Sequence, residues 1–314
     1  MLRYVNACLC LLFVLLAGCS FIDVITGKNT KKQTPGPMPS QTPTAGELVS
    51  YLNKNAGQIE SMEVEALDVE VKKGLLLQVG LNGWMVCEKP RNFRMQATIP
   101  AMGGTAADLG SNDREFWFWM SKADPPDLFY CSYADAGRVQ MNLPIQPEWV
   151  LEGMGMATIT PNDNMRVSMN ARQGTIDLVE PSRGPQGQSV YKVTTFNART
   201  VSGADPQVQS RRLVDEKGRE ICAAYIRQMQ VDPRTGVLIP KTVEFEYPAD
   251  RITMRLTLSQ ITVNGQLTPQ RTQQLFTRPN IPNVRSIDLA SYHEASPTSG
   301  PVRNAIGIFR GTGR

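Results

Sequence analysis

The clearest pattern in this sequence is an alternation of apolar and polar residues that begins after Ile59. Met62 and Val64 alternate with glutamates, and the alternation resumes from Leu67 to Val71 with its phase shifted by one residue. A period of two predicts a β-strand, and a shift of phase within it predicts a β-bulge, which bends the strand. The pattern of the first predicted strand therefore indicates that the sheet is curved.

A helical pattern precedes this strand. Thr44 and Glu47 have the spacing of a capping box, in which each side chain satisfies a free backbone N–H at the start of a helix. Apolar residues then recur at intervals of three and four and form one stripe: Leu48, Leu52, Ala56 and Ile59. Such a stripe must pack on another element, which we expect to be the sheet.

Strand patterns recur along the chain and predict about ten antiparallel strands. Asn82-Gly83 is typical of a hairpin turn, here between the runs 75–81 and 84–87, and the glycine-rich stretch 101–111 is interpreted as a loop. Pro147 is expected to begin a short central helix that reaches Met156. The other predicted strands are 93–99, 115–120, 128–133, 165–169, 175–179, 190–196, 221–231, 237–247 and 252–263. The predicted fold class is mainly β with α, a curved antiparallel sheet with two short helices.

The N-terminal residues have the features of an export signal. A basic residue, Arg3, precedes the apolar run Ala7–Ala17, and Leu16-Ala17-Gly18-Cys19 fits the lipobox of a bacterial lipoprotein signal peptide. The run is too short to span a bilayer, which needs roughly 20 apolar residues. We expect residues 1–19 to be a signal peptide and lipobox, with acyl chains such as palmitate on Cys19. The alternative is an ordinary secretory signal in which Cys19 is incidental.

Two further segments lack the apolar residues that a packed core needs. Residues 20–44 are rich in Pro, Thr, Gln and Lys and predict a flexible tether. Residues 290–314 are rich in Ser, Pro, Gly and Arg and predict a disordered tail. No comparable linker interrupts residues 45–289, so we expect them to form one domain.

Charge and cysteine content narrow the classes of function. The net charge of +4 over 314 residues is small and spread along the chain, so no basic stripe indicates nucleic-acid binding. Of the six cysteines, two would leave with the signal peptide and Cys19 would be the anchor. Cys87, Cys131 and Cys222 would lie in an oxidising compartment. Any one pair of them could form a disulfide, or all could stay buried as free thiols.

The sequence contains no pattern that predicts catalysis. Its single histidine, His293, lies at the edge of the predicted tail, so a Ser-His-Asp or Cys-His arrangement would need its base in a mobile segment. Motifs for zinc and for nucleotides are also missing. The acidic pairs Asp124 with Asp127 and Glu63 with Glu65 are explained as turn and solvent-facing residues. We therefore predict a protein that is not an enzyme and has no metal or cofactor.

The run Glu115–Met120 is the most apolar of the predicted strands. Phe116 and Phe118 would lie on one of its faces and the tryptophans on the other, so both faces need a cover. The tryptophans fit equally a packed core or the wall of an apolar cavity. With the central helix, they supply the candidate cavity or lid residues: Trp117, Trp119, Trp149, Met154 and Met156.

Three segments carry a resemblance to a known family. They are Cys87-Glu-Lys-Pro-Arg-Asn-Phe-Arg94, Leu109-Gly-Ser-Asn-Asp-Arg-Glu-Phe-Trp-Phe-Trp119 and Val231-Asp-Pro-Arg-Thr-Gly236. They resemble the segments of LolA/LolB lipoprotein carriers that precede the third strand, form the aromatic strand and turn a late hairpin. The chain is most similar to lipid-anchored, planctomycete-type members of this LolA/LppX-type superfamily, over about residues 44–289.

The resemblance implies an incomplete, or half, β-barrel over residues 45–289, closed by the N-terminal and central helices around an apolar cavity for acyl chains. Since Cys19 would anchor this chain, it is more like LolB or the LppX group than the soluble LolA. Ser20, where an aspartate would signal retention in the inner membrane, favours the outer membrane, facing the periplasm. Arg94 lies in a family-like phrase, but we interpret it as a solvent-facing strand residue.

The predicted function is the binding of acyl chains of lipoproteins or lipids, for their transport and localisation to the outer membrane. The expected partners are the membrane, through Cys19, and a lipid or acylated lipoprotein. The alternative is a cell-envelope interaction lipoprotein whose barrel is filled by its own side chains and which binds a protein partner. Neither the identity of the ligand nor the oligomeric state follows from the sequence.

Overall fold

The computed structural model describes residues 39–74, 77–100, 103–139, 147–184, 188–199 and 207–291, all within the unit Met38–Arg314. The predicted signal peptide, the lipidation site Cys19 and most of the tether lie outside the described residues, as do His293 and nearly all of the predicted tail. Among the described residues, no helix is both long enough and apolar enough to cross a lipid bilayer.

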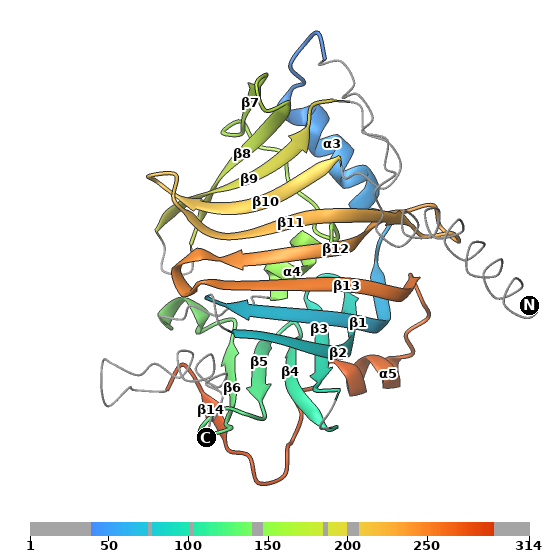
Figure 1. Ribbon diagram of the computed structural model, residues 1–314, viewed down its shortest axis with the longest axis vertical. Coiled ribbons are helices and arrows are strands. Elements are labelled where there is room, and N and C mark those ends of the chain that lie inside the picture. Colours follow the sequence, from blue (N-terminus) through green and yellow to red (C-terminus); the bar gives the residue numbers. More distant parts are fainter. Residues whose placement is uncertain are drawn as a thin grey trace, which may run out of the picture. The chain divides into compact units, whose positions relative to one another are not determined.

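The described strands form one open sheet of 14 strands in the order β14-β6-β5-β4-β3-β2-β1-β13-β12-β11-β10-β9-β8-β7 (Figure 1). Neighbours are antiparallel except for β14, which lies parallel to β6. The strands are β1 (Ser61–Lys73), β2 (Leu77–Glu88), β3 (Asn92–Thr98), β4 (Thr105–Ser111), β5 (Glu115–Met120), β6 (Leu128–Ser132), β7 (Arg166–Asn170), β8 (Thr175–Arg183), β9 (Ser189–Asn197), β10 (Val208–Asp215), β11 (Glu220–Val231), β12 (Leu238–Tyr247), β13 (Ile252–Val263) and β14 (Ser286–Asp288). The predicted fold class, mainly β with a curved antiparallel sheet, is confirmed.

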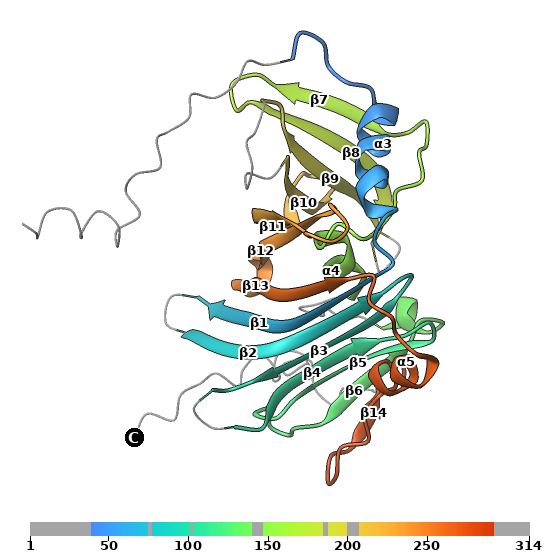
Figure 2. The same cartoon turned by 90° about the vertical axis from the view of Figure 1, so that its right-hand side faces the viewer.

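The predicted bulge lies in β1. Its register with β2 shifts between Val64 and Leu67, where the apolar alternation of the sequence changes phase. Seen from the side, the sheet is curved (Figure 2). The bulge explains part of this bend, because an extra residue in one strand increases the local twist.

The predicted hairpin at Asn82-Gly83 is wrong. Both residues lie inside β2, which pairs with β1 on one side and β3 on the other. The chain instead turns after β1, where Gly74 has a φ of +61°. A Cβ atom at Gly83 would lie 2.0 Å from the Gln96 carbonyl oxygen. Gly83 is therefore required by the close approach of β3 and not by a turn.

The prediction of a loop over residues 101–111 is also wrong for its second half, which forms β4. This segment contains small and polar residues without clear alternation, but β3 and β5 pair with it on both sides. A Cβ at Gly110 would lie 2.2 Å from the Trp117 ring, so the large aromatic of β5 occupies the space beside the small residue of β4. Strands β10 and β14 and the helix α5 (Pro269–Leu275) were not predicted from the sequence.

The N-terminal helix α3 (Ala45–Ala56) begins as predicted. Thr44 and Glu47 form the capping box, since the Glu47 N–H donates to Thr44 Oγ1 and the Thr44 N–H to Glu47 Oε2. The apolar stripe of this helix packs on the sheet, as expected. The small cluster that joins them contains Leu48, Val49, Leu52, Met165, Ile176, Leu178 and Phe196.

The main core lies on the face of the sheet that carries Met254, Leu256 and Leu258, which we call the inner face; the opposite face is the outer face. The central helix α4 (Pro147–Gly153) begins at Pro147 as predicted but ends three residues before Met156. It contributes Trp149 to this core and covers the inner face. Phe116 of the aromatic strand packs in the same core.

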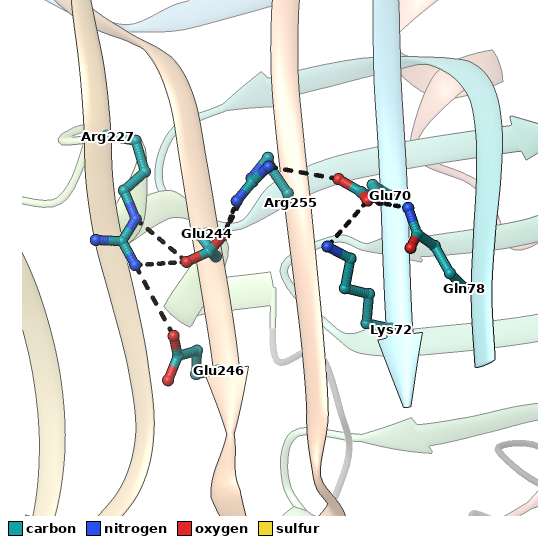
Figure 3. A network of polar contacts seen from close by, with 7 residues as sticks. All are labelled: Glu70, Lys72, Gln78, Arg227, Glu244, Glu246 and Arg255. Carbon is teal, nitrogen blue, oxygen red and sulfur yellow. Dashed lines mark hydrogen bonds and ion pairs between the residues drawn. The ribbon is translucent and has the colours of Figure 1, made fainter. Parts of the chain in front are cut away.

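A network of charged side chains crosses the outer face (Figure 3). Glu244 on β12 accepts hydrogen bonds from Arg227 on β11 and from Arg255 on β13, the latter at 2.6 Å. Arg255 also lies 3.5 Å from Glu70 on β1. Glu70 continues the network to β2, where Gln78 donates to it. Ion pairs and hydrogen bonds thus connect five neighbouring strands.

The helix α5 covers another part of the outer face, and Arg94 lies beneath it. The interpretation of Arg94 as solvent-facing is wrong, because the side chain is buried and its guanidinium donates to Asp108 at 2.7 Å. It also donates to the carbonyl oxygens of Leu275 and Thr277. The sequence predicts that the aromatic strand needs a cover on both faces. On the outer face, α5 and the residues after it provide this cover at Trp117, which is buried beside Asp108.

Glu63, interpreted as solvent-facing, and Asp127, interpreted as a turn residue, are buried as well. Glu63 binds Arg271 of α5 through an oxygen 2.5 Å from the guanidinium, and Asp127 binds Arg285 at 2.6 Å. Both partners come from the C-terminal part of the described chain, far away in sequence. The local sequence around each carboxylate therefore gave no sign of its partner.

The three described cysteines, Cys87, Cys131 and Cys222, are buried free thiols. Of the alternatives left open by the sequence, the structure therefore selects burial without a disulfide for these residues.

Candidate functional site

A cavity of about 230 Å³ lies on the inner face, between α3, the C-terminal end of α4 and strands β10 to β12. Its wall is mostly apolar and includes Leu52, Met154, Ile226, Met229, Leu238 and Pro240. The polar residues that line it include Asn55 and Arg211. An apolar wall with few polar groups is typical of a site for a small ligand.

Arg211 stands in a row of cross-strand neighbours on the inner face. The register of the sheet pairs it with Thr194 on β9 and with Ala224 on β11, and Ala224 pairs with Phe245 on β12. All of these residues are buried. The sheet thus places a guanidinium in a row that otherwise consists of small, hydroxyl and aromatic side chains.

The end of α4 approaches this row closely because Gly153 has no side chain. A Cβ atom there would lie 3.0 Å from the Phe245 ring and 3.3 Å from the Ala224 side chain. The helix then ends in a turn in which Gly155 has a φ of +73°, a conformation that glycine adopts without strain. This arrangement brings Met154 to the cavity wall.

The guanidinium of Arg211 is buried without a partner. The residue is 6% exposed, and no hydrogen bond or ion pair joins it to another residue that the structure describes. Burial lowers the pKa of Arg211 from its ordinary value, against the opposite effect of the Glu152 and Glu180 carboxylates. Arginine nevertheless stays protonated at neutral pH, so the cavity contains a buried positive charge.

The two carboxylates near Arg211 differ in their surroundings. Glu152 on α4 is ion-paired with Lys192 on β9. Glu180 on β8 is cross-strand neighbour to Lys192, and burial raises the pKa of its carboxyl group above the ordinary value. Both carboxylates thus have Lys192 as a neighbour in addition to Arg211.

Large apolar side chains are exposed at the rim of the cavity. Tyr51 on α3 is 44% exposed and Leu238 on β12 is 36% exposed, and both line the cavity. Asn55 holds this rim together, because its side chain donates to the Leu238 carbonyl at 2.8 Å and accepts from the Leu238 N–H at 3.0 Å. Exposed apolar groups around a concave apolar surface are a feature of binding sites.

A buried cysteine lies on the same face of the sheet as Arg211. Cys222, whose cross-strand neighbour is Leu213 two residues after Arg211, has its pKa raised to about 12 by burial and by nearby carboxylates, so its thiol is protonated at neutral pH. In the described part of the chain, no three His, Cys, Asp or Glu side chains are grouped so that they could hold a metal ion.

The structure separates the predicted cavity residues. Met154 lines the cavity, and Trp149 and Met156 are buried in the core beside it. Trp117 lies on the outer face with its indole N–H 3.4 Å from Asp108, and Trp119 donates its indole N–H to the Pro126 carbonyl at 3.0 Å. The two tryptophans of the aromatic strand therefore do not join the residues of α4.

Sequence reasoning missed the residues that define the cavity chemically, Arg211 above all. Arg211 and Arg212 are consecutive, and two adjacent charges hide the alternation by which β10 would have been recognised. Leu52 was part of the predicted helical stripe, but nothing in the sequence indicated that it would line a cavity. Arg211 can be recognised as a cavity residue only once the register of β10 with β9 and β11 shows that it lies on the inner face.

Comparisons with known proteins gave structural matches only. No family model and no curated protein sequence matches the chain. A LolA superfamily protein from Nitrosomonas europaea is similar, with 12% identity and a TM-score of 0.45 over 75% of this chain and 98% of that one. An outer membrane lipoprotein-sorting protein domain from Vibrio parahaemolyticus shows 10% identity and a TM-score of 0.43 over 74% and 98% of the two chains.

A DUF1329 family protein from Desulfovibrio piger is also similar, with 11% identity and a TM-score of 0.42 over 74% of this chain and 97% of that one. The superfamily that three segments of the sequence resemble is thus represented among these structures.

Proposed function

We propose that this chain is an exported, lipid-anchored protein of the cell envelope that binds an acyl chain of a lipoprotein or lipid in the cavity on the inner face. The observation that carries the proposal is the apolar cavity itself, with Tyr51 and Leu238 exposed at its rim. Buried methylene groups contribute about 0.8 kcal/mol each, so an acyl chain gains free energy by entering such a surface from water.

The size of the cavity limits what it binds. At about 230 Å³ it is smaller than the roughly 300–1,000 Å³ of sites that enclose drug-sized ligands. It accommodates part of one chain and leaves the rest of the ligand at the rim. A carrier that holds only part of a chain releases it more readily than one that buries it completely, which suits transfer without catalysis.

The anchor and the tether complete the proposal. Acylation of Cys19 would hold the protein at a membrane, and residues 20–44 would allow the domain to move relative to it. The protein would then receive or present lipid locally. Ser20 after the anchor favours the outer membrane as its location.

Co-purification of lipid tests the proposed function. The full chain with Cys19→Ser, expressed in a bacterium, is examined by native mass spectrometry and by lipid extraction. Met229→Trp fills the cavity from a half-buried position on its wall and should remove the bound lipid. Met169→Trp is the matched control, since Met169 is exposed and lies outside the cavity.

Absence of lipid from the parent protein, or equal amounts of lipid in all three proteins, would contradict the proposal. The first result would favour the other sequence-based prediction, an interaction lipoprotein that binds a protein partner.

A further inference from the structure

An acyl chain accounts for the apolar wall of the cavity but not for Arg211. The side chain is buried, carries a positive charge and makes no hydrogen bond or ion pair with a described residue, although the Glu152 and Glu180 carboxylates act on it from a distance. A charge in this position is unfavourable unless something opposite to it binds there. A fully apolar ligand would leave it unpaired and would exclude water from it.

We propose that the cavity binds a single-chain amphiphile with an anionic oxygen head, a carboxylate or a phosphate, and that Arg211 binds the head. This rests on the proposed function and specifies the class of ligand. The guanidinium presents several N–H donors in a planar fork, which matches two oxygens of a carboxylate or phosphate.

The positions of the lining residues give the ligand a direction. Among the lining residues, Arg211 and Met154 are buried, whereas Tyr51 and Leu238 are exposed, so we place Arg211 at the inner end of the cavity and Tyr51 and Leu238 at its rim. The head therefore enters first, and the chain lies along the apolar wall toward the rim. This direction requires a free head, so an acyl chain attached through its carboxyl carbon to a lipoprotein would not satisfy Arg211.

The protein itself provides two carboxylates that compete for the guanidinium. Glu152 and Glu180 both act on the charge of Arg211, Glu152 more strongly, but Glu152 is already ion-paired with Lys192. Glu180 is therefore the carboxylate to replace in a test. Lys192 is the cross-strand neighbour of Glu180, so the Glu180 carboxylate interacts with both Lys192 and Arg211. Replacement of Glu180 by a neutral residue should therefore strengthen the binding of an anionic head.

The test uses three ligands of equal chain length: decanoate, decyl phosphate and decanol. Their binding to the full chain with Cys19→Ser is measured by isothermal titration calorimetry. At least one anionic ligand should bind at least about tenfold more tightly than decanol, because a hydrogen-bonded charge pair adds to the contribution of the chain. The preference between decanoate and decyl phosphate shows which head the site takes.

Arg211→Met should remove this preference and leave the binding of decanol unchanged or stronger. Arg212→Met is the matched control. The Arg212 side chain belongs to the next residue of β10 and points to the outer face, where it lies 3.3 Å from Thr195 Oγ1 and 3.7 Å from Asp177. This control should keep the preference of the parent protein.

A second variant keeps the test independent of folding. Glu180→Gln should bind the preferred anionic ligand several-fold more tightly than the parent, a gain that a misfolded protein does not show. Equal binding of all three ligands, unaffected by Arg211→Met, would overturn the role of Arg211 while leaving the apolar site intact. Failure of all three ligands to bind would overturn the proposed function as well.

Discussion

Arg94 on β3 donates a hydrogen bond of 2.7 Å to the Asp108 carboxylate on β4, and both side chains are buried. The same guanidinium donates to the Leu275 carbonyl at 2.9 Å and to the Thr277 carbonyl at 3.1 Å. A single side chain thereby joins two strands to the end of α5. Arg94 and Asp108 are both charged and buried, so the loss of one leaves the charge of the other without compensation.

Arg94→Met should destabilise the protein by about 3 kcal/mol, because Asp108 would remain buried with only neutral donors. Gln96, at 2.7 Å from Asp108, is one of these donors. Urea denaturation followed by circular dichroism measures the change. Arg219→Met is the control, since Arg219 is exposed in its ion pair with Asp215 and should be replaced without measurable effect. Equal stability of the two variants would show that α5 is held by other contacts.

Gly83 should tolerate no side chain. Gly83→Ala would place a Cβ atom 2.0 Å from the Gln96 carbonyl oxygen, and relief of that clash requires movement of β3. We expect a loss of about 2 kcal/mol or more, which a shift of the thermal midpoint measures. Gly80→Ala, in the same strand, meets no atom within 4 Å and should be neutral or slightly stabilising. Similar losses in both variants would show that the strand itself disfavours alanine.

Glu244 should make stability depend on pH. Burial tends to raise the pKa of its carboxyl group, but hydrogen bonds from Arg227 and Arg255 outweigh burial and hold it below its ordinary value of 4.5. A lowered pKa in the folded state means that the ionised carboxylate stabilises the fold above about pH 4.5, and that this contribution is lost as the pH falls through the folded value.

Glu244→Gln should therefore lower stability at neutral pH by on the order of 1 kcal/mol, since both arginines are partly exposed to solvent. The difference from the parent should shrink toward zero in acid. Urea titrations at several pH values measure it. A difference that stays constant between neutral and acid pH would show that the effect of the mutation is not due to the charge.

Local sequence patterns correctly predicted the elements that are determined by residues close to one another in the sequence. In β13, Met254, Leu256 and Leu258 alternate with polar residues, and the structure buries the first set on the inner face. The capping box of Thr44 and the bulge after Val64 are equally local, since each depends on neighbours within a few residues. Such features can be predicted because no distant contact is needed to form them.

The errors occurred where a distant contact decided the structure. Asn82-Gly83 is a turn signal by itself, but β3 pairs with it and keeps the chain extended. The sequence around Arg94 is that of a strand with an exposed arginine, but α5, far along the chain, covers this residue. Arg211 could not be assigned to the cavity, because its face depends on the register of β10 with both neighbours.

The buried cysteines should react only when the protein unfolds. Burial and the nearby Asp288 and Asp135 carboxylates raise the pKa of Cys131 to about 11, and burial and nearby carboxylates raise that of Cys222 to about 12. Burial also raises the pKa of the Cys87 thiol above its ordinary value. At about pH 8, a thiol with a pKa near 11 or above is ionised in roughly one molecule in a thousand or fewer. The thiolate is the form that reacts, so these cysteines should be inert in the folded protein.

Iodoacetamide labelling of native protein without reductant, followed by peptide mapping, should leave these three cysteines unmodified. The same reaction in denaturant, again without reductant, should label all of them. A cysteine that is labelled in denaturant only after reduction would contradict the free thiols of the structure, and rapid labelling of native protein would contradict their burial.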